Sequence, residues 1–350
     1  MKIILKKMHG HNCKFPMRCQ KEILLKVDVM YGKYGGTMQF ENKQYWGVIL
    51  GASSGFGLAT AKKLASQGMN ICAVHRDRRG SMKNVEEEFD AIRACGVKFL
   101  SMNTNALDPE ARQEVLNTLQ KNLGEGEKIR MLLHSIAFGN LKLVAPFPDG
   151  NRQASVRTLL AEKLGISREK MDTAIQDLFS VGVSRLYPLA DPPAYSNERL
   201  ASEEDFSNTI YAMGTSLLGW VQDIFSRKIF ASDARVFGLT SEGNSVAWRG
   251  YAPVSAAKAV LESVSRTLAV EMAPYGIRCN IIQAGVTDTP ALRHIPGHAH
   301  IVSSAMLRNP FKRLTRPEDV ANVIALLCTD EAAWINGDII RVDGGEHIAG

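Results

Sequence analysis

The strongest constraint on the fold is a glycine-rich turn at residues 51–57, Gly-Ala-Ser-Ser-Gly-Phe-Gly. It follows a short apolar run, Trp46–Leu50, and precedes a stretch, Thr60–Ser66, that is predicted to be helical and to stop at Gly68. Glycines in such a turn let the chain reverse tightly and let the N–H groups at a helix start approach a phosphate. An ordinary strand-to-helix turn can look the same, so the surrounding pattern decides its meaning.

The alternation of short apolar runs and helical stretches continues along the chain. The further runs are Asn70–Val74, Val97–Met102, Ile129–Leu133, Ala234–Leu239, Arg278–Ile282 and Asp338–Val342, and helices are predicted at Ser81–Cys95, at Pro109–Leu123 and around Lys258. Short, wholly apolar strands that alternate with helices are typical of a parallel sheet with helices on both faces. The sequence therefore predicts an α/β protein with a Rossmann-type, doubly wound parallel sheet.

One segment interrupts this alternation. After the fourth strand, residues 141–205 are predicted to leave the sheet and to contain two helices, Val156–Leu164 and Arg168–Phe179, followed by a proline-rich stretch. Connections of this length are uncommon unless they are functional or form a small subdomain. Because ligands bind beyond the carboxyl ends of the strands in such sheets, we expect this helical insertion to form part of the substrate wall.

The positive charge of the chain is concentrated at its start. The 350 residues carry a net charge of +6, and residues 1–37 hold eight basic and two acidic side chains, which account for all of it. We expect this basic extension to be poorly ordered, with residues 38–350 forming a single Rossmann-fold domain. The remaining 34 basic and 34 acidic side chains cancel, so we expect no nucleic-acid partner.

The sequence shows no sign of a membrane or secreted protein. It has no run of about 18 apolar residues and no apolar signal segment. Its six cysteines form no CxxC pair, which favours reduced thiols and a cytoplasmic location. His9, His11, Cys13 and Cys19 do not have the spacing of a common zinc finger, so we expect no metal.

The end of the second predicted strand bears on the choice of cofactor. It continues into His75-Arg76-Asp77-Arg78-Arg79. Guanidinium groups bind phosphate through paired donors, so this cluster favours NADPH, whose ribose carries a 2′-phosphate. Asp77 keeps NADH possible, because a carboxylate at this place can accept from a free ribose hydroxyl. A solvated basic loop is a further alternative.

Residues 239–258 carry a resemblance to a known family. The segment runs from Leu239-Thr-Ser241 to Tyr251-Ala-Pro-Val-Ser-Ala-Ala-Lys258. Together with the 51–57 turn and the closing segment 334–345, it resembles the short-chain dehydrogenase/reductase family over residues 45–345. That family commonly places a Tyr four residues before the Lys and a Ser thirteen residues before that Tyr. Counted back from Lys258, those positions hold Val254 and Ser241.

The spacing of the tyrosine resembles one branch of that family. Tyr251 lies seven residues before Lys258, which is close to two helical turns, so both can share one helix face. This Tyr-x6-Lys spacing is similar to that of the enoyl-acyl-carrier-protein reductases. The segments His134–Phe138 and Gln283–Thr289 are similar to the same branch.

The resemblance implies an enzyme that reduces the carbon–carbon double bond of an enoyl thioester with NAD(P)H, as in fatty acid synthesis. It implies a substrate carried by acyl carrier protein and a homotetramer. Two departures leave alternatives open. Ser241 stands where that branch often has a second Tyr, and the 51–57 turn is closer to the general family. A carbonyl or 3-oxoacyl reductase using Ser241 and Tyr251 therefore remains possible, as does a non-catalytic NAD(P)-binding sensor.

The resemblance also implies the site residues. Tyr251 is expected to bind the carbonyl oxygen of the substrate, Lys258 the nicotinamide ribose, and Ser241 the carbonyl of a ketone. Asn105 is expected near the adenine, and Thr287 and Thr289 near the carboxamide and the pyrophosphate. The residues expected to contact the cofactor are Gly51, Ser53, Ser54, Gly55, Phe56, Gly57, Arg76, Asn105, Ala106, Ser135, Ile136, Ala137, Lys258, Gly285, Thr287 and Thr289.

Overall fold

The computed structural model describes residues 39–41, 43–147 and 152–349, so the predicted basic extension 1–37 lies outside the described residues. Residues from Phe40 onward form one compact unit. The described residues contain a seven-stranded sheet in the order β3-β2-β1-β4-β5-β6-β7, with every neighbouring pair parallel. The predicted Rossmann-type fold is confirmed. The strands are β1 Tyr45–Leu50, β2 Asn70–His75, β3 Phe99–Asn103, β4 Lys128–His134, β5 Phe230–Thr240, β6 Ile277–Ala284 and β7 Ile339–Val342.

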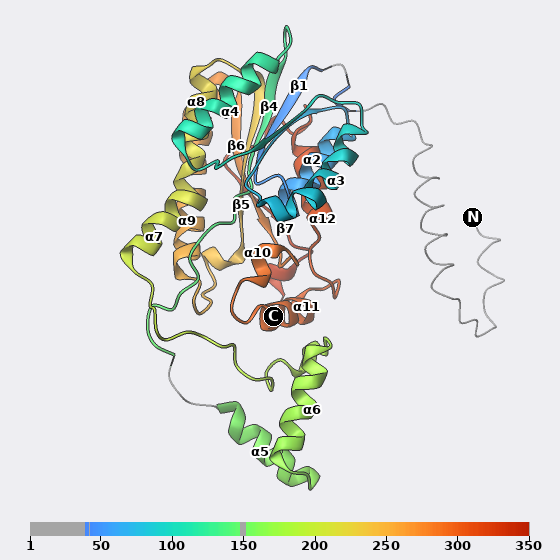
Figure 1. The fold of residues 1–350 in the computed structure, drawn as a ribbon, viewed down its shortest axis with the longest axis vertical. Helices are drawn as coiled ribbons and strands as arrows, with labels where there is room; N and C mark the ends of the chain where they lie inside the picture. Colours follow the sequence, from blue (N-terminus) through green and yellow to red (C-terminus); the bar gives the residue numbers. More distant parts are fainter. Residues whose placement is uncertain (1–38, 42, 148–151, 350) are drawn as a thin grey trace, which may run out of the picture. The chain divides into compact units, whose positions relative to one another are not determined.

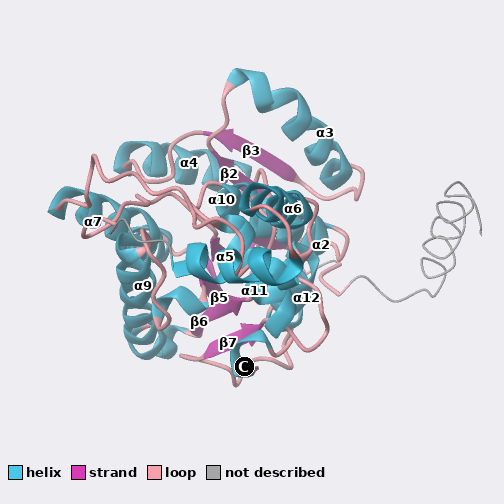
Figure 2. Ribbon diagram, turned by 90° about the horizontal axis from the view of Figure 1, so that it is seen from below, coloured by secondary structure: helices cyan, strands magenta, loops and turns pink. Residues whose placement is uncertain are grey.

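Helices cover both faces of the sheet (Figures 1 and 2). On one face, α4, α8 and α9 pack against a core that includes Trp220, Leu261 and Val236, while α2, α3 and α12 cover the other face around Phe89 and Phe237. The helices are α2 Gly55–Ala65, α3 Met82–Arg93, α4 Pro109–Asn122, α5 Arg152–Leu164, α6 Arg168–Ser180, α7 Glu203–Ile210, α8 Ser216–Ser226, α9 Ala252–Glu271, α10 Pro290–Arg293, α11 His298–Arg308 and α12 Pro317–Leu327.

The glycine-rich turn joins β1 to α2 as a tightly packed corner. Gly51 has φ +87°, and a Cβ there would lie 2.4 Å from the carbonyl oxygen of Ser135. A Cβ on Gly57 would lie 2.1 Å from the carbonyl oxygen of Gly51. Only glycine fits either position. The helix begins at Gly55, five residues earlier than predicted, because two of the three glycines belong to its first turn.

Strand β5 is longer than the predicted run Ala234–Leu239. It begins at Phe230, and its first half contains Ser232 and Asp233. The prediction was too short because these polar residues hide the strand pattern. They lie at the amino end of the strand, where arginine side chains pair with Asp233.

The segment after β4 contains the two predicted insertion helices, α5 and α6. Ala161 on α5 packs against Met171 and Ile175 on α6. The buried guanidinium of Arg157 pairs with Asp191 at 2.8 Å and with Asp172 at 3.2 Å. The chain then enters α7 at Glu203, so the last residues of the predicted insertion 141–205 are already helical. A single π-helical turn, Tyr211–Thr215, joins α7 to α8.

Contacts between α6 and α11 connect the insertion to the rest of the unit. The ring of Phe179 lies 4.9 Å from that of His300 on α11, measured between centroids. A Cβ on Gly297, which precedes α11, would lie 2.4 Å from Pro193 in the proline-rich stretch. The insertion therefore packs against α11 and against Gly297, which precedes that helix.

Three of the described cysteines are core residues. The thiols of Cys72, Cys279 and Cys328 are free and buried, and burial raises the pKa of each to about 12. Cys95 is free and half-buried. None of the described helices has the length and apolar character needed to cross a membrane.

Candidate active site

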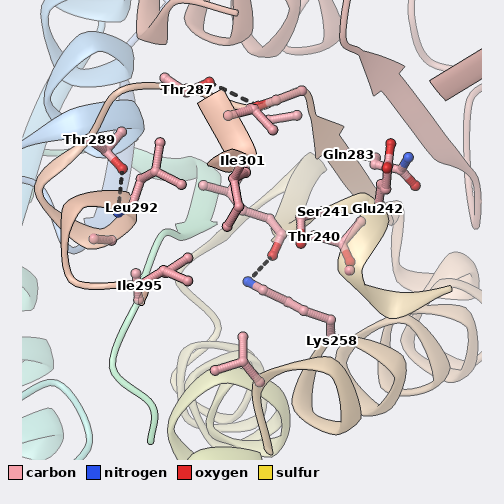
Figure 3. Close-up of a pocket in the computed structure, with 18 of the residues that line it drawn as sticks. Thr240, Ser241, Glu242, Lys258, Gln283, Thr287, Thr289, Leu292, Ile295 and Ile301 are labelled. Atoms are coloured by element: carbon pink, nitrogen blue, oxygen red, sulfur yellow. Dashed lines mark hydrogen bonds between the residues drawn. The ribbon is translucent and has the colours of Figure 1, made fainter. Parts of the chain in front are cut away.

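A cavity of about 240 Å³ opens beyond the carboxyl ends of the central strands. Its walls come from the segments that follow β4, β5 and β6, from the start of α9, and from α10 and α11. Figure 3 shows Lys258 reaching from α9 toward Thr240 and Ser241, with Thr287, Thr289 and Leu292 on another wall. This is the edge of the sheet where open α/β folds bind their ligands.

Lys258 is a buried cation in this wall. Its Nζ donates a hydrogen bond of 2.6 Å to the carbonyl oxygen of Leu239, at the end of β5. Burial lowers the pKa of this ammonium to about 8, although the carboxylate of Glu262, one turn further along α9, acts in the opposite direction. An ammonium has three donors, so Lys258 can bind further acceptors that enter the cavity.

Tyr251 and Ser241 face the same cavity from neighbouring segments. Tyr251 stands at the start of α9, and its ring packs against Gly243, where a Cβ would lie 2.6 Å from Cε1. Burial raises the pKa of the Tyr251 phenol, and the nearby Ser241 hydroxyl acts in the opposite direction. Among the described residues, however, the buried Ser241 Oγ has no partner in hydrogen-bonding geometry. A protonated phenol and an unpaired hydroxyl thus lie side by side in the wall.

Val254 also lines this cavity. It occupies the position at which the family commonly has its tyrosine. Since Val254 has no polar group, Tyr251 is the tyrosine that the cavity offers next to Lys258.

The start of α2 fits the pyrophosphate of a dinucleotide. Ser54, at the N-terminal boundary of the helix, makes no capping bond with its side chain, and the first turn has no acidic residue. The N–H groups of that turn therefore remain available to an anion, and the helix dipole favours one. The backbone at Gly55 faces the side chain of Thr289, where a Cβ would lie 3.5 Å from Cγ2. Gly51, Ser53 and Gly57 shape the same corner.

The predicted nicotinamide-side residues line the cavity. They come from three separate segments, the turn after β1, the segment after β4 and the segment after β6. Thr287 Oγ1 donates to the carbonyl oxygen of Gly285 at 3.0 Å, and Thr289 Oγ1 accepts from Leu292 N at the start of α10 (Figure 3). The predicted residues in this wall are Phe56, Ser135, Ile136, Ala137, Gly285, Thr287 and Thr289.

The residues of the predicted adenosine end, Arg76 and Asp77, do not line that cavity. The guanidinium of Arg76 stacks on the exposed ring of Phe138, with Cζ 4.7 Å from the centroid. The carboxylate of Asp77 instead accepts from His75 Nδ1 at 2.7 Å. No ion pair of Arg76 is found within the described ranges. Arg76 is thus an accessible cation, whereas one carboxylate oxygen of Asp77 is already engaged.

Asn105 and Ala106 follow β3 and do not line the cavity. Asn105 Oδ1 accepts from Leu107 N at 3.3 Å, and the carbonyl oxygen of Ala106 accepts from the Trp220 indole at 2.9 Å. Both residues thus form hydrogen bonds within the protein, just after the end of β3. Their predicted contact with the adenine stays a prediction.

Several residues of the cavity wall were not predicted from the sequence. Trp248 and Ile301 add apolar surface, and an ionic cluster joins Glu242 and Glu346 to Arg308 on α11. These residues come from separate segments without a shared motif. Glu262, which accepts from the wall residue Thr240, could have been found, because a residue four positions after Lys258 on a helix lies on the same face.

Two family comparisons match most of the described chain. Residues 46–160 match the family described as short chain dehydrogenase, and residues 193–347 match the one described as enoyl-(acyl carrier protein) reductase. The boundary between them falls in the insertion.

Individual relatives of the chain carry the names of three different oxidoreductases. The chain is 23% identical over 311 residues to the 3-oxoacyl-[acyl-carrier-protein] reductase FabG of Escherichia coli, covering 89% of this chain and all of that protein. It is 39% identical over 100 residues to the NADH-dependent enoyl-[acyl-carrier-protein] reductase FabI of Aquifex aeolicus, covering 29% of this chain and 37% of that protein. It is 38% identical over 110 residues to a cis-4-hydroxycyclohexanecarboxylate dehydrogenase of Sinomonas cyclohexanicum, covering 31% and 41%. The two higher identities thus span less than half of those relatives.

A solved structure shows the same fold. FabI from Candidatus Liberibacter asiaticus superposes with a TM-score of 0.65 at 18% identity, covering 89% of this chain and 98% of that one.

Proposed function

The chain belongs to the short-chain dehydrogenase/reductase family, and from that premise we propose that it reduces the carbon–carbon double bond of an enoyl thioester with NAD(P)H. The observation that carries this proposal is the position of Tyr251, seven residues before Lys258, with both side chains in the wall of one cavity. Val254 stands at the common tyrosine position and cannot donate a proton. The cavity also has the apolar walls that an acyl chain requires.

The site residues have separate roles in the proposed reaction. When bound, a nicotinamide dinucleotide supplies the hydride. Tyr251 donates a hydrogen bond to the thioester carbonyl oxygen, where negative charge develops during reduction at the β-carbon. Its raised pKa keeps the phenol protonated at neutral pH. Lys258 contributes positive charge in a buried wall, where the interaction with a developing anion is strong.

We propose NADPH as the preferred cofactor, with NADH as a weaker alternative. Arg76 supports this preference because it carries a guanidinium without a carboxylate partner among the described residues. The carboxylate of Asp77, which would favour NADH, already accepts from His75. Gly51, Ser53, Ser54, Gly55 and Gly57 would hold the pyrophosphate.

The second candidate is the reduction of a ketone, as in a 3-oxoacyl reductase. The specific observation in its favour is the unpaired, buried Ser241 Oγ beside Tyr251, which could donate to a ketone oxygen. The match to FabG over that protein's full length supports it as well. A non-catalytic NAD(P)-binding sensor would bind the cofactor and turn over neither substrate.

We further propose that the thioester is carried by acyl carrier protein, and that the enzyme is a cytoplasmic homotetramer. The free, buried thiols of Cys72, Cys279 and Cys328 suit a reducing compartment. The exposed apolar residues Leu218 on α8 and Val270 on α9 support contacts between copies along these helices. Light scattering after size exclusion would measure the number of copies.

Replacing Tyr251 by Phe tests the mechanism. We expect kcat with a crotonyl thioester to fall about 100-fold to 1000-fold, the scale of losing one donor to a developing oxyanion. Tyr275→Phe is the matched control, because Tyr275 is exposed and lies outside the cavity. Full activity of Tyr251→Phe on the enoyl substrate would overturn the assignment.

A further inference from the structure

The turn that carries Ser241 is bonded to two different helices, α9 and α11. It consists of Ser241 and the short 3₁₀ helix Glu242–Asn244, after β5. On the side of α9, the buried carboxylate of Glu262 accepts from Thr240 Oγ1 at 2.5 Å and from Asn244 Nδ2 at 2.6 Å. These two donors flank Ser241 in the sequence, so α9 fixes the turn relative to the helix that also carries Lys258.

On the side of α11, Arg308 holds the middle of the turn. Its Nη1 lies 2.7 Å from Glu242 Oε1, and its Nη2 donates to Glu242 Oε2 at 2.9 Å. The same Nη2 lies 3.3 Å from Oε1 of Glu346, a buried residue near the C-terminal end of the chain. The pair with Glu242 is bidentate, and such pairs fix both distance and angle.

Helix α11 is part of the wall that the substrate would face. Ile301, Ser304 and Ala305 line the cavity, and Arg308 is the last residue of the helix. The next residue, Asn309, donates through Nδ2 to the carbonyl oxygen of Asp343 at 2.8 Å. This end of α11 is thus tied to both the Ser241 turn and the chain after β7.

We propose that Arg308 is a positioning residue that fixes the spacing between the α11 wall and the Ser241 turn. This inference rests on the proposed function only in so far as a thioester must occupy the cavity beside Ser241 and Tyr251. The Arg308–Glu242 pair thereby sets the distance between the α11 wall and the turn, and with it the space left for the thioester. The ion pairs of Arg308 go to Glu242 and Glu346, and it acts on the turn through Glu242.

The geometry of the Arg308–Glu242 pair determines which substitutions should change thioester binding. Lysine in place of Arg308 keeps the charge but cannot form two parallel bonds to Glu242. We therefore expect Arg308→Lys to raise KM for the thioester about tenfold, the scale of one charge-assisted hydrogen bond. We expect NADPH binding to change less than about twofold, because the bidentate pair that is lost goes to Glu242 and not to a predicted cofactor residue.

The experiment combines kinetics with a measurement that needs no turnover. Arg308→Lys, Arg308→Gln, Glu242→Gln and the double variant Arg308→Gln/Glu242→Gln are compared with wild type. Arg313→Lys is the matched control, because Arg313 forms an exposed pair with Asp319 at 2.6 Å outside this cavity. Amide hydrogen exchange is followed in residues 298–308 and 239–246, together with NADPH affinity and the thermal midpoint.

The proposal predicts that exchange rises in both segments together when either partner of the pair is removed. It also predicts that the double variant is no worse than Arg308→Gln alone, because both changes break the same interaction. Additive losses, unchanged exchange, an unchanged KM, or a parallel loss of NADPH binding would overturn it. Failure of the proposed function looks different, because wild type would then not turn over crotonyl thioester, while the exchange data would still decide the role of Arg308.

Discussion

Buried polar side chains gather at both ends of the sheet, and the two groups differ in how completely they are paired. At the amino end, the side chains of Arg130 and Arg235 are 1% exposed, and both pair with Asp233. Arg278 pairs with the same carboxylate. At the carboxyl end, the buried Ser241 Oγ has no partner among the described residues.

The amino-end cluster also caps the C-terminal end of helix α12. Arg235 Nε donates to the carbonyl oxygen of Leu327 at 2.9 Å, and Arg130 Nε donates to that of Cys328 at 3.0 Å. These carbonyls are among those that lack a partner within the helix. Since every charge in this cluster is used within the protein, its function is to hold the sheet and α12 together.

The carboxyl-end group is paired less completely. Among the described residues, the buried Lys258 ammonium has three donors and one hydrogen-bond acceptor, the carbonyl oxygen of Leu239. Buried polar groups without partners cost stability, so folds retain them where a ligand completes them. The unpaired donors of Lys258 and Ser241, rather than burial or charge, distinguish the candidate active site from the structural cluster.

The largest effect on stability is expected from breaking the ion pairs of the amino-end cluster. Asp233→Asn removes the carboxylate shared by three arginines, and we expect the free energy of unfolding to fall by about 3–5 kcal/mol. Asp288→Asn, which breaks an exposed pair with Arg293, is the control and should cost about 0–1 kcal/mol. Urea denaturation measures both. Equal losses in the two variants would show that the cluster is not structural.

Arg76→Ala should weaken the binding of NADPH and leave NADH unaffected. A guanidinium that binds a 2′-phosphate contributes charge-assisted hydrogen bonds, so we expect KM for NADPH to rise on the order of 10-fold to 100-fold. Steady-state kinetics with both cofactors provide an internal control. A parallel rise in KM for NADH would mean that Arg76 maintains the conformation of the loop and does not bind the 2′-phosphate.

Glu262→Gln should shift the pH dependence of the reaction. The charged and titratable groups near Lys258 are Glu262 on α9, Tyr251, and the buried His134 at the end of β4. Burial, followed by the charge of Lys258, lowers the pKa of His134 to about 3, so it is neutral at the pH of the assay.

Lys258 has a pKa of about 8, so its charge and the dependent activity are present below pH 8 and lost as the pH rises through it. Removing the Glu262 carboxylate should move this loss to lower pH by on the order of one unit. A kcat profile from pH 6 to about pH 9 measures the shift. An unchanged alkaline limb would show that the charge of Lys258 is not needed.

The smallest effect on enoyl reduction is expected for Ser241→Ala. If Tyr251 alone supplies the hydrogen bond to the thioester oxygen, kcat with a crotonyl thioester should change by about twofold or less. A change of about that size is typical of a substitution that removes only a minor contact. Any acetoacetyl activity should fall much further. A large loss on the crotonyl substrate would make Ser241 a second donor in enoyl reduction.

The same comparison explains which features could be predicted from sequence. The glycine-rich turn and the spacing of Tyr251 and Lys258 are local patterns, and local patterns place residues on a turn or a helix face. The order of wholly apolar strands and helices was enough to predict the parallel sheet. Helix α2 was predicted to start too late because glycine is a poor helix former.

Interactions between distant segments could not be predicted. Arg308 pairs with Glu242 across 66 positions and with Glu346 across 38. Arg130 reaches Asp233 across 103 positions. No periodicity links such residues, and their alignment depends on strand register and on the path of α11. For that reason the sequence revealed the catalytic candidates but neither the Arg308 pair nor the amino-end cluster.

Oxidation of NADPH by crotonyl and acetoacetyl thioesters, measured side by side with NADH as the comparison cofactor, tests the central claim most directly. We expect turnover of the crotonyl thioester, faster with NADPH than with NADH, and little or none of the acetoacetyl thioester. Turnover of the acetoacetyl thioester alone would contradict it and would make the protein a carbonyl reductase that uses Ser241 and Tyr251.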